Sequence, residues 1–131
     1  MGLKARSRVR FGALDGWILA AAAHAGADGR VATWRQLIAS ADYLEHATPT
    51  HRQLGCAVAR LEAVGHLRLM KTGVVVAPAV LARVPRVGGS LRRRYADVWR
   101  LPAPALAPTP MDNPIPYRDY QRAVAIHRAW G

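Results

Sequence analysis

The chain has 131 residues, which is long enough for one domain whose core needs no disulfide or metal ion. Its single cysteine, Cys56, excludes an intrachain disulfide and a cysteine metal cluster, and no apolar run reaches transmembrane length. The formal net charge is +11, and only Lys4 and Lys71 among the nineteen basic residues are lysines. Arginine suits bidentate contacts to phosphate or guanine. A GC-rich genome would produce the same arginine bias with no functional meaning.

The basic residues are unevenly distributed along the chain. Residues 1–10 carry four positive charges and no negative ones, and residues 11–50 carry two arginines against four acidic residues. Residues 51–100 hold ten basic residues against two acidic ones, whereas the residues from 101 onward have a net charge of +1. This distribution predicts one basic face rather than uniform solubilising charge.

The N-terminus predicts a flexible basic arm over residues 1–11. Its basic residues precede the apolar run WILAAAAHAGA, an order that a secretory signal also has. Asp15 and His24 interrupt that pattern, so we favour a cytoplasmic protein of bacterial type. The first helix is expected from about Leu14 to Ala25, and Gly26 is suited to its end.

Two further helices are predicted from their capping signals. Thr33 and Thr50 are each followed three residues later by glutamine, which is the capping-box pattern of a helix start. The second helix carries its apolar residues on one stripe, and residues 42–47 continue it as helix or as a loose turn. The third helix begins either at Thr48-Pro49 or at Thr50, and Gly65 ends it.

A short β-hairpin is predicted after the third helix. Residues 66–71 alternate polar and apolar side chains, as a half-buried strand does. Residues 74–76 continue as a second strand after the turn at Thr72-Gly73. Pro78 limits that strand to an edge or an end of the sheet.

The C-terminal third predicts one more helix, a linker and a terminal helix. Ser90 is suited to cap a helix over about 91–99, in which three consecutive arginines occupy the first turn. Cations there oppose the helix dipole, so we expect them to contact phosphate or an acidic partner rather than to form a solvated face. Residues 102–116 are rich in proline and predict an extended linker, and residues 117–131 predict a C-terminal docking helix.

The order of these elements resembles the winged helix-turn-helix superfamily, in the manner of small bacterial regulators. The segments that carry the resemblance are TWRQLIASA, TPTHRQLGCAVARLEAVGHL and RLMKTGVVV. The resemblance implies an α+β, mostly helical domain over residues 12–101, with three helices, a short β-hairpin and additional C-terminal helices. It also implies that the third helix lies in the major groove of DNA and that the hairpin touches the flanking backbone. The acidic stretch 42–47 and the very short wing depart from the compact family pattern.

This resemblance and the charge distribution together predict a DNA-binding protein, most simply a transcriptional regulator. Side chains near the start of the third helix would face the groove, others would lie on the wing, and the arm and the fourth helix would clamp phosphates. The expected DNA-binding residues are Thr48, Thr50, His51, Arg52 and Arg60 on or beside the third helix, Arg68 and Lys71 on the wing, Lys4, Arg6, Arg8 and Arg10 in the arm, and Arg92, Arg93 and Arg94 in the fourth helix.

Two other functions remain open at this point. Gly55, Cys56, Ala59 and Ala63 form a strip of small residues on the third helix, where the C-terminal helix, a partner protein or a second copy of the chain would pack closely. The arginines would equally serve an RNA- or ribosome-associated protein. We expect no enzyme, because the sequence holds no catalytic motif, and we expect no cofactor, no metal site and no membrane partner.

Overall fold

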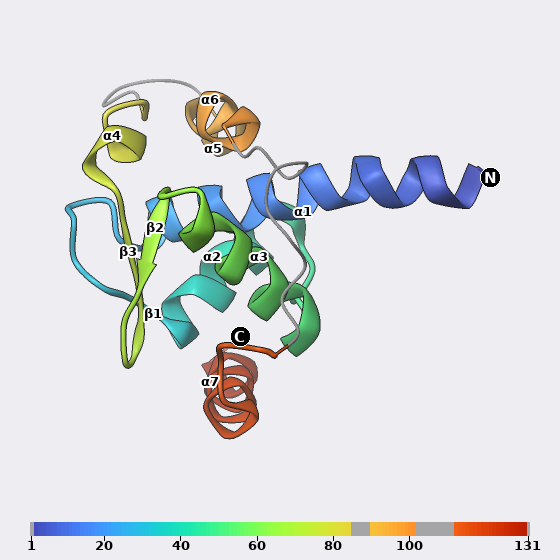
Figure 1. The fold of residues 1–131 in the computed structure, drawn as a ribbon. Helices are drawn as coiled ribbons and strands as arrows, with labels where there is room; N and C mark the ends of the chain where they lie inside the picture. Colours follow the sequence, from blue (N-terminus) through green and yellow to red (C-terminus); the bar gives the residue numbers. More distant parts are fainter. Residues whose placement is uncertain (1, 85–89, 102–111, 131) are drawn as a thin grey trace.

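The computed structural model describes residues 2–84, 90–101 and 112–130, with side chains for 14–84, 90, 93–101 and 112–129. The architecture is α+β and mostly helical, with helices packed around a small antiparallel sheet (Figure 1). This confirms the coarse fold class predicted from the sequence.

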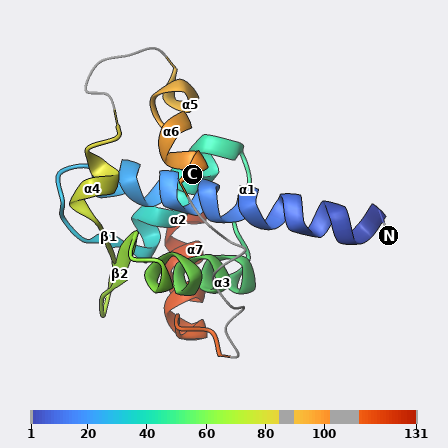
Figure 2. The same cartoon turned by 45° about the horizontal axis from the view of Figure 1, so that its top comes forward.

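The first helix, α1 (Gly2–Ala25), begins much earlier than expected. The prediction of a flexible arm over residues 1–11 is therefore wrong for the backbone of residues 2–11, which forms the first turns of this helix. No proline interrupts the segment, and the basic residues in it are good helix formers, so a helix nucleated by the buried part extends through it. In both ribbon views α1 runs out of the body of the molecule toward the N-terminus (Figures 1 and 2).

The next two helices start at the predicted caps. In α2 (Trp34–Glu45) the Thr33 hydroxyl accepts a hydrogen bond from the Gln36 backbone N–H at 3.3 Å, and the Gln36 side chain accepts one from the Thr33 N–H at 3.0 Å. The α3 helix (His51–Ala63) has the same reciprocal pair at Thr50, which settles the two-residue ambiguity of its start. Both capping boxes are confirmed.

The sheet contains β1 (Ala32–Thr33), β2 (Leu67–Leu69) and β3 (Gly73–Val76) in the order β1-β3-β2. The predicted hairpin pairs Leu67 with Val76 and Leu69 with Val74, and β1 adds to its free edge by pairing Thr33 with Gly73. A side chain at Gly73 would place Cβ only 1.9 Å from the Ala32 carbonyl oxygen, so the close approach of these strands requires glycine.

The C-terminal part contains α4 (Pro78–Leu81), α5 (Leu91–Arg94), α6 (Ala96–Arg100) and α7 (Tyr117–Trp130). The single helix expected over 91–99 is instead divided at Tyr95, whose backbone leaves the helical region while its side chain is buried. The predicted terminal helix is present as α7. The linker predicted over 102–116 lies outside the described residues up to 111, and residues 112–116 run directly into α7.

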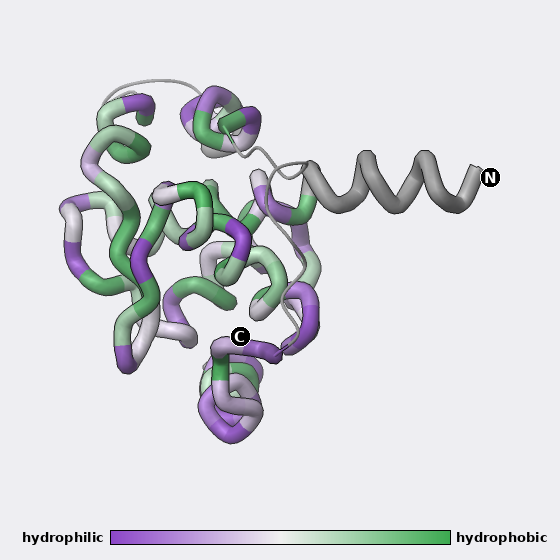
Figure 3. Tube along the Cα trace, in the orientation of Figure 1, coloured by the Kyte–Doolittle hydropathy of each residue, from purple (hydrophilic) through white to green (hydrophobic). Residues whose placement is uncertain are grey.

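The core is centred on the C-terminal half of α1, which α2, α3 and α6 contact (Figure 2). Four consecutive alanines, residues 20–23, are fully buried there beside Ile18 and Leu19. Small side chains on several faces of one helix let the neighbouring helices approach closely, and Leu37, Leu54 and Val58 fill the remaining space. Figure 3 shows hydrophilic residues on outer segments of the fold, among them α7, the tip of the hairpin, α5 and the start of α3.

Candidate nucleic-acid interface

The start of α3, expected to face a DNA groove, is covered by the chain's own C-terminal segment. The His51 ring Nε2 lies 2.6 Å from the Ile115 carbonyl oxygen, and the Asn113 side-chain amide donates to the His51 carbonyl at 2.9 Å. Ile115 itself is 1% exposed. His51 is therefore wrong as a residue free to enter a groove, because its polar edge is used within the fold.

Aromatic rings complete this cover. The His51 ring lies 5.1 Å from Tyr117 and 5.3 Å from Tyr120, measured between ring centroids. The Tyr120 hydroxyl donates to the Pro49 carbonyl at 2.7 Å, so α7 also holds the turn that precedes α3. The first turn of a recognition helix usually supplies the base contacts, and here it supports intramolecular packing.

The small-residue strip on α3 is also occupied. A Cβ at Gly55 would lie 2.0 Å from the Asn113 side-chain oxygen, so glycine is what allows Asn113 to sit on the helix. The strip was predicted to admit a close neighbour, and that neighbour is the 113–115 turn. The α7 helix itself packs mainly on α2. At Gly55 the strip is therefore not a free surface for a partner protein or a second copy.

Arg60 was predicted to reach DNA, and this is wrong. Its guanidinium donates from Nε to one carboxylate oxygen of Asp15 at 3.0 Å and from Nη2 to the other at 3.1 Å, and both side chains are 1% exposed. Burial raises the pKa of Asp15, and the hydrogen bond and charge of Arg60 oppose that rise. The sequence signal for this pair was Asp15 itself, an acid inside an apolar helix stripe that needs a buried partner.

The remaining predicted residues fall into four groups. Thr50 is exposed, but its hydroxyl accepts the capping hydrogen bond from the Gln53 backbone N–H. Thr48 is half-buried. Arg94 is half-buried beside Tyr95, and its Nε is buried without a hydrogen-bond partner among the described residues, so its role in clamping a phosphate stays a prediction. The cations that remain exposed are Arg52, Arg68, Lys71 and Arg93. The structure does not describe the side chains of the last group, which are Lys4, Arg6, Arg8, Arg10 and Arg92.

Several exposed cations were missed at the sequence level. Arg35 lies in the first turn of α2, and Arg118, Arg122 and Arg128 lie on the outer side of α7. The available signal was the pair Arg118 and Arg122, which are four residues apart and so lie on one face of α7, away from Val124. The net charge of this segment hides the arrangement, because Asp112 and Asp119 offset two of its three arginines.

Four carboxylates are engaged by groups other than these exposed cations. Asp15 pairs with Arg60 in the core, Asp28 pairs with Arg30, and the Asp42 carboxylate lies 2.8 Å from His127 Nε2. Glu62 accepts a hydrogen bond from the Leu69 backbone N–H at 2.8 Å. The buried pair removes one charge of each sign, so the net charge of +11 is carried by the rest of the chain.

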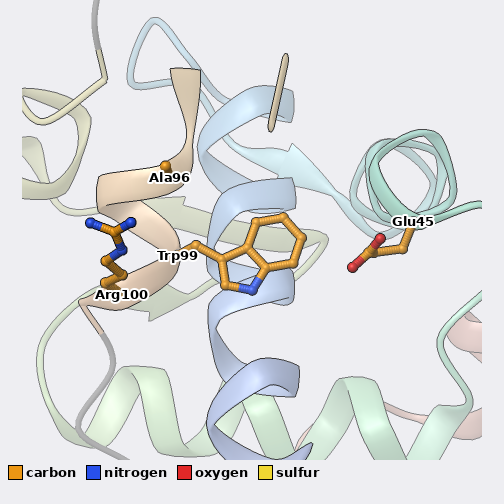
Figure 4. Close-up of a pocket in the computed structure, with 4 residues that line it drawn as sticks. All are labelled: Glu45, Ala96, Trp99 and Arg100. Carbon is orange, nitrogen blue, oxygen red and sulfur yellow. The ribbon is translucent and has the colours of Figure 1, made fainter. Parts of the chain in front are cut away.

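A cavity of about 330 Å³ lies between α2 and α6 and is lined by Glu45, Ala96, Trp99 and Arg100. Figure 4 shows the Trp99 indole lying across α1, with the Glu45 carboxylate on one side and the Arg100 guanidinium on the other. The backbone of Trp99 rests on Gly16, where a Cβ would meet the Trp99 carbonyl oxygen at 2.2 Å. One acid and one base facing a tryptophan form no recognisable catalytic set, so we assign this cavity to helix packing.

Comparison with protein-family models, with curated proteins and with solved structures gives no match. Within the described residues, no helix is both long enough and apolar enough to cross a membrane. No group of three or more histidine, cysteine, aspartate or glutamate side chains is placed to hold a metal ion in the same part of the chain.

Proposed function

We propose that this chain is a winged-helix protein that binds duplex DNA through the phosphate backbone. The order of elements supports the winged-helix assignment: helix, strand, two helices, and then a two-strand hairpin whose second strand pairs with the first strand. The bundle of α1, α2 and α3 behind this sheet corresponds to the arrangement that the sequence resemblance implied.

The observation that carries the proposal is the set of exposed basic side chains without an acidic partner. None of them takes part in an ion pair among the described residues, and they lie on α2, α3, the hairpin, α4 to α6 and α7. They are Arg35, Arg52, Arg68, Lys71, Arg83, Arg93, Arg100, Arg118, Arg122 and Arg128. Cations of this kind release counterions from DNA when they bind it, and that release supplies affinity without base recognition.

The covered start of α3 supports backbone contact over base reading. His51 and Arg60 are used within the fold, so Thr50 and Arg52 are the predicted groove residues of α3 that remain exposed. Two side chains offer little direct discrimination between bases. We therefore propose binding with weak sequence preference, and a role in transcription stays a prediction.

Fluorescence anisotropy with a labelled duplex of about 20 base pairs tests this proposal. We expect binding at micromolar protein in about 50 mM salt, little difference between unrelated sequences, and affinity that falls steeply toward about 200 mM salt. With about four phosphates neutralised, the slope of log K against log salt is about −3.6.

Absence of binding at micromolar protein in low salt would overturn the proposal. Preference for single-stranded or double-stranded RNA over DNA would favour the RNA-associated alternative. A complex with another protein that survives high salt, in the absence of DNA binding, would favour the protein-contact alternative, because apolar burial is not screened by salt.

A further inference from the structure

We propose that the groove between the hairpin turn, the first turn of α2 and α7 seats a backbone phosphate of the bound nucleic acid. This inference rests on the proposed function and gives it a location. The groove has a volume of about 320 Å³, and its charged lining residues are Arg35, Lys71, Asp119 and Arg122. The sequence alone did not predict that these four residues share one site.

Three cations reach this groove from three separate elements. Arg35 comes from α2, Lys71 from the hairpin turn and Arg122 from α7, and all three are exposed. None of the three forms an ion pair with a described residue, although Asp119 lines the same groove. Gathering like charges without pairing them costs free energy, and a bound anion would offset that cost.

The groove is built on elements that are held together by backbone and side-chain contacts. The Trp34 backbone N–H donates to the Thr72 carbonyl at 3.2 Å, which fixes the hairpin turn against the start of α2. On the other side, Ala123 and Val124 of α7 are 5% and 8% exposed, and His127 contacts Asp42 of α2. The three cations are therefore carried by packed elements, which limits the ordering cost of binding.

One wall of the groove is apolar. Trp34, Ala123 and Ile126 line it, and Ile126 is one of the most exposed large hydrophobic residues of the described chain. An apolar wall strengthens the attraction between nearby cations and a phosphate because it excludes water from one side. The same wall gives a deoxyribose ring an apolar surface to contact.

Neighbouring cations extend the groove in the direction of α3. Arg118 precedes Arg122 by four residues and so lies on the same face of α7. Tyr117, the next residue toward the N-terminus, contacts the His51 ring beside the exposed Arg52. A nucleic-acid strand that follows α7 would thus meet Arg122, Arg118 and Arg52 in turn. In this arrangement the covered start of α3 would not enter the major or minor groove of the DNA.

Alanine substitutions at Arg35, Lys71 and Arg122 test the assignment in the full chain, with the same labelled duplex as probe. Each is expected to weaken binding about threefold to tenfold and to lower the salt slope by about one. The matched control is Arg30→Ala, since Arg30 is exposed but pairs with Asp28, and it belongs neither to the set of unpaired cations nor to the lining of the groove. It removes the same charge and should change affinity less than twofold if nearby phosphates are not contacted.

Asp119→Asn provides the opposite change. The substitution removes the negative charge of the groove, so it should tighten duplex binding by about threefold, and a thermal melt of each variant verifies the fold. If the groove variants and Arg30→Ala weaken binding equally, the groove assignment is overturned while backbone binding by the whole surface stands. If the unmodified chain binds no duplex, the proposed function itself fails. If polyglutamate binds to the chain instead of duplex DNA, and the groove variants abolish that binding, the groove binds an acidic polypeptide. The phosphate assignment is then wrong.

Discussion

Among the side chains that the structure describes, Asp15 and Arg60 are the charged ones that the fold removes almost completely from water. Each is 1% exposed, and the two form a two-point ion pair between α1 and α3. The favourable interaction in such a pair roughly offsets the desolvation of both charges, whereas one member left alone is strongly unfavourable. The pair therefore specifies how α1 sits against α3 more than it adds net stability.

Arg60→Ala is expected to lower the free energy of unfolding by about 3–5 kcal/mol, because Asp15 would remain buried without its partner. Urea denaturation followed by circular dichroism measures this loss. Arg52→Ala on the exposed side of α3 is the control and should change stability little. Equal stability of the two variants would contradict the structural role of the pair.

His24 gives the fold a pH dependence. Its ring Nδ1 lies 3.3 Å from the Tyr95 hydroxyl, and burial, followed by the charge of Arg94, lowers its pKa from 6.5. The unfolded chain then binds a proton at pH values where the folded chain does not, so acidification below 6.5 favours unfolding.

Stability measured by urea denaturation should therefore fall as the pH is lowered from about 7.5 toward about 5, and His24→Asn should flatten part of that fall. Asparagine retains a polar atom near Tyr95 but does not titrate. A parallel pH dependence in the variant and the unmodified chain would show that His24 does not contribute.

At the scale of elements, helix packing depends on glycines that allow unusually close contacts. Gly16 lets the Trp99 backbone rest on α1, and Gly55 lets Asn113 rest on α3. Glycine inside a helix costs about 1 kcal/mol relative to alanine, so its use at these positions reflects the approach of another segment. The sequence marked Gly55 as a place of close packing but left its neighbour open, and it gave no sign of the contact at Gly16.

Gly55→Ala is expected to displace the 112–116 turn from α3, because the new Cβ would overlap the Asn113 side chain. Hydrogen–deuterium exchange should become faster over residues 112–120 while the α1 core, represented by Ile18 and Leu19, keeps its protection. The double variant Gly55→Ala/Asn113→Ala relieves the overlap and should restore part of the protection. Unchanged exchange in the single variant would mean that the turn accommodates the methyl group.

At the scale of the whole molecule, the C-terminal segment acts as an outer layer on a core that is already formed by the first three helices and the sheet. Ile115, Ala123 and Val124 are buried against this core, whereas the outer side of α7 carries exposed arginines. The same segment therefore supplies both apolar cover and positive charge. These two contributions should be separable by experiment.

Deletion of residues 112–131 is expected to lower the melting temperature by about 5 °C or more while the helical circular dichroism of the remaining chain persists. The expected loss reflects the removal of the apolar contacts with α2 and α3, and persistence reflects the core around Leu37, Leu54 and Val58. The shortened chain should also bind DNA with a smaller salt slope, since Arg118, Arg122 and Arg128 are gone. Complete unfolding would show that α7 belongs to the folding core.

Much of the architecture followed from local signals in the sequence. The capping boxes at Thr33 and Thr50 and the Thr72-Gly73 turn each involve groups within a few residues, so they determined where α2, α3 and the hairpin begin. Helical periodicity placed α7 for the same reason. Local chemistry is sufficient when both partners of an interaction are close in the chain.

The surface that remains available was decided by tertiary contacts. Arg60 pairs with Asp15 across 45 residues and His51 contacts Ile115 across 64, and no local pattern encodes either meeting. Burial of a charge depends on which helix packs beside it, and exposure of an arginine depends on which segment fails to cover it. For this reason the sequence by itself determined the elements and their caps. Only the packed structure decided which cations face solvent and which are buried in contacts within the fold.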